Sequence, residues 1–181
     1  TQTTLTARPL SGRVPVGGRR NRIANSENMA SWGTNSGEVS VTSGATDPLG
    51  GNTAVRVTGN SGTFRLTAPL TSGLPATTLT TTTVWARSVS GIPEFGVFAG
   101  GGSASKTITA DWAEYDIPVT TGSSNLNSYQ FRLLGAGKVI EFWRPQVETG
   151  SATPYQASRS SRDVTEPNVK TVQYAYFDAN D

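Results

Sequence analysis

The chain contains neither cysteine nor histidine, and these two absences exclude several kinds of chemistry. Without cysteine there is no thiolate nucleophile, no disulfide framework and no zinc ribbon. Without histidine there is no Ser-His-Asp triad and no imidazole ligand for a metal ion. Only carboxylate, lysine and tyrosine chemistry remains open to an enzyme.

Charged residues are also scarce, at 15% of the 181 residues, whereas glycine, serine and threonine are abundant. This composition is typical of an all-β protein with hydroxyl-covered sheet faces and many turns. No apolar run approaches the roughly 18 residues that a membrane span needs, so we expect no membrane partner. We also expect no metal site and no cofactor, because a chain of this length can bury a sufficient core without them. The chain begins at Thr1 rather than Met, which a trimmed initiator Met or a fragment of a longer chain would explain.

The central part of the chain, residues 21–158, has a hydrophobic period of two. Val39 and Val41 alternate with polar residues, and Tyr129 and Phe131 do the same further on. Such alternation, broken by glycine-rich turns, predicts an all-β, two-sheet antiparallel β-sandwich of the jelly-roll type. We also expect one helical turn over residues 26–32, capped by Ser26. The predicted strands cover residues 38–42, 53–58, 64–70, 79–87, 95–97, 107–109, 112–120, 129–133 and 139–143.

The two ends of the chain differ in charge. Residues 1–22 hold five arginines and no acid, whereas residues 163–181 hold four acids and one lysine. We interpret residues 1–20 as an extended basic arm, either solvated or ordered against a neighbouring subunit. Residues 159–181 are a linker and a β-prone tail, which either adds an edge strand to the same sandwich or pairs with another subunit. The predicted assembly residues are Arg8, Arg13, Arg19, Arg20 and Arg22 in the arm, and Val172, Tyr174 and Tyr176 in the tail.

Four stretches, in a fixed order, resemble a known family. They are Asn21-Arg22-Ile23-Ala24-Asn25-Ser26-Glu27-Asn28-Met29 with Trp32, the turn at residues 47–54, the strand Trp112-Ala113-Glu114-Tyr115-Asp116-Ile117, and the closing residues 146–155. Together they resemble the jelly-roll domain of tailed-phage virion proteins, which occurs in head fibres, tail fibres and head spikes, including those of gene transfer agents. The chain departs from that pattern at Met29, where the family has an aromatic residue, and at Arg144-Pro145, where it has Gly-Ala. The tail after Ser158 has no counterpart in the pattern.

The resemblance implies a sandwich like that of carbohydrate-binding modules and a place on the surface of a virion. We therefore expect a non-enzymatic structural subunit: a head decoration, a head-spike base or a fibre adaptor. Its terminal arms would assemble it into a trimer or pentamer beside the major capsid protein or other virion proteins. The alternative is a glycan-binding adhesin module of a tail fibre that recognises host surface polysaccharide. We expect no nucleic-acid partner, because the basic arm lacks interleaved aromatic residues.

The candidate glycan-binding residues are Trp85, Arg87, Trp143 and Arg144. Sugar rings stack on exposed indoles, although tryptophans within alternating strands belong more often to a core or an interface. Each of these two tryptophans lies near an arginine, which predicts a mixed aromatic and cationic surface if the side chains point outward. Glu114 and Asp116 would share a strand face, about 7 Å apart. We interpret them as solvated surface acids rather than as a glycosidase pair.

Overall fold

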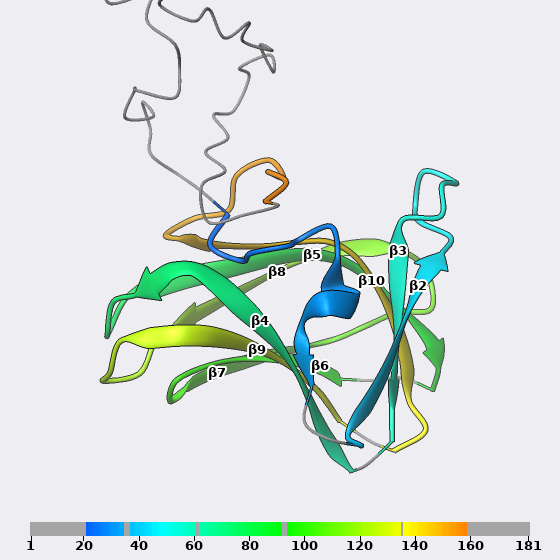
Figure 1. The fold of residues 1–181 in the computed structure, drawn as a ribbon, viewed down its shortest axis with the longest axis horizontal. Helices are drawn as coiled ribbons and strands as arrows, with labels where there is room; N and C mark the ends of the chain where they lie inside the picture. The colour runs from blue at the N-terminus through cyan, green and yellow to red at the C-terminus, as the bar shows by residue number, and fades with distance from the viewer. Residues whose placement is uncertain (1–20, 35–36, 61, 92–93, 135, 159–181) are drawn as a thin grey trace, which may run out of the picture.

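The computed structural model describes residues 21–158, except residues 35–36, 61, 92–93 and 135. Its strands form two antiparallel five-stranded sheets that pack face to face (Figure 1), which confirms the predicted β-sandwich. The first sheet has the order β1 (Gly33–Thr34), β4 (Thr63–Leu74), β9 (Leu126–Leu134), β6 (Glu94–Ala99), β7 (Gly102–Thr107). The second has the order β2 (Val39–Ala45), β3 (Ala54–Gly59), β10 (Val139–Thr149), β5 (Leu79–Ser90), β8 (Ala113–Thr120). The predicted arm, residues 1–20, and tail, residues 159–181, lie outside the described residues. Arg22 is described, and its backbone bonds to Val147 and Thr71 within the domain.

The core between the sheets follows from the alternation of apolar residues. In β6 every second residue is buried, and in β9 Tyr129 and Phe131 are buried on either side of the partly exposed Gln130, because successive side chains of a strand point to opposite faces. Phe131 of β9 lies at the centre of an aromatic cluster. Its ring centroid is 5.4 Å from that of Phe95 in the same sheet and 6.1 Å from that of Phe142 in the opposite sheet. These aromatic contacts join the two layers.

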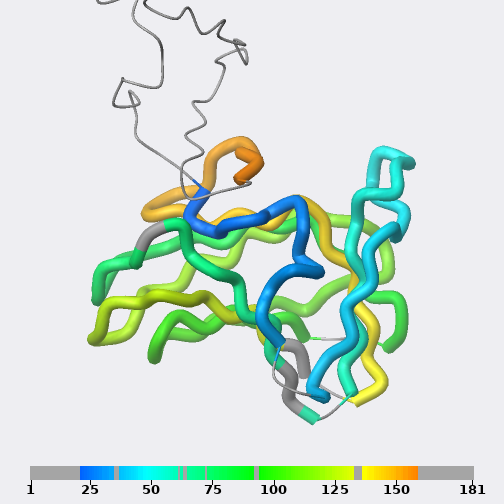
Figure 2. The backbone as a smooth tube through the Cα atoms, viewed as in Figure 1, coloured from blue at the N-terminus to red at the C-terminus, as the bar shows by residue number. Residues whose placement is uncertain are grey.

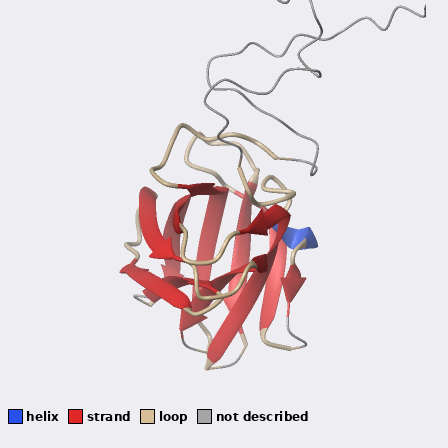
Figure 3. Cartoon of the chain, turned by 90° about the vertical axis from the view of Figure 1, so that its left-hand side faces the viewer, coloured by secondary structure: helices blue, strands red, loops and turns tan. Residues whose placement is uncertain are grey.

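The only helical segment among the described residues is a single 3-10 turn, Met29–Ser31, drawn in blue in Figure 3. It is shorter than predicted, and Ser26 does not cap it. The Ser26 hydroxyl lies 2.9 Å from the Tyr155 hydroxyl and accepts a hydrogen bond from the Ser158 backbone N–H. Ser26 therefore joins the beginning of the domain to its end. In the part of the chain that the structure describes, no helix is long and apolar enough to cross a bilayer.

The strand predicted at residues 107–109 is wrong, because the strand β7 precedes it and ends at Thr107. β7 has little apolar signal, since it is an edge strand that pairs, among the described strands, with β6 alone. The buried Ile108 that suggested a strand instead follows β7 and contributes to the core as a loop residue. The two-residue strand β1 also escaped prediction, because two residues carry no periodicity.

Segments from the two ends of the domain lie side by side, as the blue and orange parts of the tube in Figure 2 show. The buried side-chain amide of Asn21 joins them: its Nδ2 donates to the carbonyls of Pro145 and Gln156, and its Oδ1 accepts from the N–H groups of Ile23 and Val147.

The closing segment is held by two buried side chains of β10. Gln146 bonds to the backbone of Thr153 and Gln156, and the carboxylate of Glu148 accepts from the N–H and hydroxyl of Thr153. The opening and closing motifs of the sequence therefore have a structural explanation: their side chains hold the two ends of the domain together, an arrangement that we call the clasp.

Candidate functional site

All four predicted glycan-binding residues lie on the outer face of the sheet that contains β10. Trp143 of β10 and Trp85 of β5 are register partners, and their rings meet edge to face with centroids 6.3 Å apart. Arg87 follows two residues after Trp85 on the same face, and Arg144 lies in the irregularity of β10 between Trp143 and Gln146. The structure thus brings the four residues together on one side of the sandwich.

Arg87 is already engaged within the protein. The fully buried carboxylate of Glu141 accepts hydrogen bonds from Arg87 Nε at 2.7 Å and from Arg56 Nη2 at 2.6 Å. The guanidinium of Arg87 also lies 5.1 Å from the ring centroid of Trp112. Its charge is therefore compensated by Glu141, and its position is fixed by contacts within the domain.

Trp143 is also largely used inside the protein, with 7% of its surface exposed. Its indole Nε1 donates to the Thr53 hydroxyl at 2.8 Å, and that hydroxyl donates to the Asp47 carboxylate at 2.6 Å. Contacts within the domain thus cover this part of the outer face and leave little of the Trp143 ring for a ligand. Trp85 remains partly exposed.

The buried Asp47 accepts four hydrogen bonds: two from Thr53 and one each from the N–H groups of Leu49 and Gly51. The Thr53 hydroxyl contributes most to lowering the pKa of Asp47, burial opposes it, and the backbone N–H groups lower it further. Because donors already surround both carboxylate oxygens, this carboxylate acts as an anchor for the turn.

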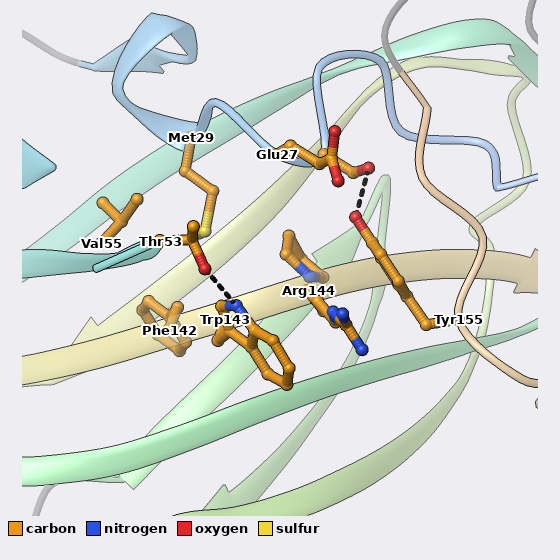
Figure 4. A pocket seen from close by; sticks show the side chains of 10 residues that line it. Glu27, Met29, Thr53, Val55, Phe142, Trp143, Arg144 and Tyr155 are labelled. Carbon is orange, nitrogen blue, oxygen red and sulfur yellow. Dashed lines mark hydrogen bonds between the residues drawn. The ribbon is translucent and has the colours of Figure 1, made fainter. Parts of the chain in front are cut away.

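A pocket of about 290 Å³ opens beside the β10 irregularity (Figure 4). We call it the Arg144 pocket. Its floor is apolar and consists of Met29, Val55 and Phe142, which are all buried. Pro145 and a set of polar or aromatic residues complete the lining: Ser26, Glu27, Thr53, Trp143, Arg144 and Tyr155.

The outer face of the other sheet carries polar groups that the sequence analysis did not select. We call it the open face. One register row runs across all five of its strands, and a second row crosses β4, β9, β6 and β7. The first row is Gly33, Thr67, Gln130, Phe98 and Ser103; the second is Arg65, Arg132, Gly96 and Ser105.

Arg132 is at the centre of the open face. Its guanidinium carbon lies 3.8 Å from the ring centroid of Phe98, and Gln130 Oε1 accepts from its Nε at 3.2 Å and its Nη2 at 3.0 Å. Among the described residues no carboxylate lies within 4.0 Å of it, whereas neighbouring Arg65 pairs with Glu38 at 3.2 Å. Desolvation, and then the positive charge of Arg65, lower the pKa of Arg132. A cation oriented in this way has N–H donors left for a ligand.

The two acids that the sequence analysis considered as a glycosidase pair both lie on β8 (Ala113–Thr120). Glu114 and Asp116 do share the outer face of β8, opposite Trp85 and Thr83, and Asp116 accepts a hydrogen bond from the Thr83 hydroxyl. The described residues also contain no group of three acidic side chains able to hold a metal ion. The Arg144 pocket has one carboxylate, Glu27.

No family model and no curated protein matches the sequence. Solved structures do match its fold. The fold is similar to that of carbohydrate-binding modules. The CBM22-1 xylan-binding domain of Paenibacillus barcinonensis Xyn10C aligns over 74% of this chain and 95% of its own, with a TM-score of 0.52 and 15% identity. At this identity the likeness establishes the sandwich and no more.

Two further neighbours are larger proteins, of which this chain spans less than a third. The CBM22-1–GH10 modules of Clostridium thermocellum xylanase 10B, complexed with xylohexaose, align over 77% of this chain and 30% of theirs, with 12% identity and a TM-score of 0.57. The enzymatically active domain of tailspike protein 4 from bacteriophage CBA120 aligns over 72% of this chain and 21% of its own, with 12% identity and a TM-score of 0.51. The sandwich fold thus occurs both in xylan-degrading enzymes and in a phage tailspike.

Proposed function

We propose that this domain is a non-catalytic glycan-binding module that holds polysaccharide on its open face. The observation that carries the proposal is the Arg132 guanidinium, which lies on the Phe98 ring, is oriented by Gln130, and has no acidic partner within 4.0 Å in the described chain. Hydrogen bonds from a charged donor are worth about 1.5–3 kcal/mol. A sugar hydroxyl on Arg132 would therefore contribute measurable affinity.

The shape of the open face fits an extended chain rather than a small molecule. Five strands at about 4.8 Å spacing give a row roughly 19 Å long. Gly33 and Gly96 interrupt the rows without side chains, so the floor between the polar groups is low. The hydroxyl and amide groups of Thr67, Ser103 and Gln130 flank Arg132 along these rows. Such a floor offers donors and acceptors along the length of a glycan.

Two further observations support binding without catalysis. Structural neighbours with a similar sandwich are named as a xylan-binding domain and as modules complexed with xylohexaose. Glycoside hydrolysis needs two carboxyl groups across one cleft. Near the open face Glu38 is paired with Arg65 and Glu94 accepts a hydrogen bond from Ser105, so both acids are engaged in contacts of the domain.

Affinity electrophoresis in gels that contain soluble polysaccharides tests the proposal. The wild type is expected to be retarded by at least one polysaccharide, and Arg132→Gln is expected to lose about tenfold or more in affinity. Lys138→Gln is the matched control, because it removes a cation from the β9–β10 turn, away from the open face. Equal retardation of Arg132→Gln and the wild type would contradict the proposal that polysaccharide binds to the open face.

A second candidate function is a subunit of a virion surface. The motifs that resemble phage virion jelly rolls favour it, and the tailspike neighbour shows that such a sandwich occurs in a phage protein. Ordering an arm costs about 1–2 kcal/mol per residue, so the predicted arm would need a closed ring of partners to repay it. Deleting residues 1–20 is expected to leave a folded sandwich that no longer enters particles. Incorporation of the truncated protein would contradict the role of the arm.

A further inference from the structure

The Arg144 pocket is separate from the open face. The residue that gives the pocket its name has an unusual backbone conformation. Arg144 has a φ of +50°, in the left-handed region that residues other than glycine rarely occupy. Such a conformation is strained and persists only where the surroundings determine it. It lies at the irregularity of β10, and bulges of this kind redirect side chains at the edges of binding sites.

The side chain of Arg144 lies against two aromatic rings. Its guanidinium carbon lies 3.9 Å from the ring centroid of Trp143 and 5.4 Å from that of Tyr155. Figure 4 shows the three side chains along one wall of the pocket. Arg144 is exposed, and no carboxylate of the described residues lies within 4.0 Å of it. The cation is thus oriented by stacking, and its charge is not neutralised by a contact ion pair.

Two hydroxyl groups that line the pocket are already engaged in hydrogen bonds. The Thr53 hydroxyl is engaged with both Trp143 and Asp47, and the Tyr155 hydroxyl lies at hydrogen-bonding distance from Ser26. The floor is apolar, and the volume of about 290 Å³ is at the small end of the range for ligand pockets. A pocket with an apolar floor, an aromatic wall and one oriented cation suits a single ring that carries an anionic group.

We infer that the Arg144 pocket binds one carboxylate-bearing sugar residue, a uronic acid, with the carboxylate on the Arg144 guanidinium. The planar fork of arginine matches a carboxylate with two parallel hydrogen bonds, which a neutral hydroxyl cannot form. Glu27, which also lines the pocket, would accept a hydrogen bond from a ring hydroxyl. This site is distinct from the open face, so one module would hold a glycan at two places.

Titration of the tryptophan fluorescence with methyl glucuronide and with methyl glucoside tests the inference, because Trp143 forms part of the wall. The wild type is expected to bind the glucuronide at least tenfold more tightly than the glucoside. Arg144→Gln should abolish that preference, and Arg144→Lys, which retains the charge but not the fork, should restore only part of it. Lys138→Gln, in the β9–β10 turn and outside both proposed sites, should leave it unchanged.

Three outcomes would overturn the inference: equal affinity for the two sugars, a preference that survives Arg144→Gln, or acetate binding as tightly as the glucuronide. The Glu27→Gln variant separates the acidic from the neutral ligand. It removes a negative charge and should strengthen glucuronide binding or leave it unchanged, whereas a neutral sugar held between Arg144 and Glu27 would bind more weakly. If polysaccharide is retained through Arg132 while the pocket shows no preference, the proposed function stands and this inference fails.

Discussion

Replacing Asn21 by alanine is expected to destabilise the whole domain, although the residue lies at the start of its described chain. The Asn21 side chain makes four hydrogen bonds of 3.0–3.2 Å, two as donor and two as acceptor, and all four of their partners are backbone groups. Its own exposure is 1%. A net contribution of about 1 kcal/mol for each hydrogen bond gives a loss of about 4 kcal/mol.

That loss is large against the roughly 5–15 kcal/mol that stabilises a typical domain. For a protein of this size, about 2–4 °C of melting temperature is lost for each kcal/mol, so Asn21→Ala should melt roughly 8–16 °C below the wild type. Differential scanning calorimetry measures the shift. The control is Asn60→Ala, because Asn60 is exposed and its side chain donates one hydrogen bond, to the Ser40 hydroxyl. Equal melting temperatures for the two variants would refute the view that Asn21 clasps the ends of the domain.

Three further predictions concern stability and follow from single contacts. Gly122→Ala should cost about 1–3 kcal/mol in urea unfolding, because a Cβ there would lie 1.7 Å from the Gly100 carbonyl oxygen, whereas Gly62→Ala meets nothing within 4 Å and should cost much less. Glu141→Gln should lower the free energy of unfolding by about 1–3 kcal/mol, because it leaves Arg56 and Arg87 without their shared carboxylate. The control is Glu114→Gln, at an exposed residue. Equal unfolding midpoints for the two variants would contradict the role of the Glu141 ion pairs. Since the pKa of Asp47 is lowered in the folded state, its contribution to stability is complete above about pH 4 and is lost as the pH falls through the lowered value. Urea titrations from pH 6 to about pH 2 should therefore show a shallower acid decline for Asp47→Asn, and an unchanged slope would rule this out.

The sequence was sufficient to predict the sandwich, because burial of alternate residues is a local signal. The alternation of apolar and polar residues predicts both the strands and the face that each strand turns to the core, as at Val39 and Val41 of β2 and at Tyr129 and Phe131 of β9. The edge strand β7 was missed because Ser103–Lys106 offers one alanine as its only apolar residue. The Ser26 cap failed because a residue 132 positions away, Ser158, engages its hydroxyl.

The candidate site was predictable in part. Arg144 was selected because it adjoins Trp143 in the sequence. The structure places the Arg144 guanidinium over the rings of both Trp143 and Tyr155. Arg132 was not selected, because Phe98 is 34 positions away in sequence and meets it through the pairing of β6 with β9. The alternation of β9 does place Arg132 on an outer face, but without strand register nothing indicates which aromatic residue faces it.

The most direct test of the central claim is the affinity of the described domain for polysaccharide, compared between the wild type, Arg132→Gln and Lys138→Gln by isothermal titration calorimetry. Binding by the wild type and by Lys138→Gln, with a loss of about tenfold or more for Arg132→Gln, is the predicted result. Heats indistinguishable from dilution for the wild type, across neutral and acidic polysaccharides alike, would contradict the claim that this sandwich holds glycans.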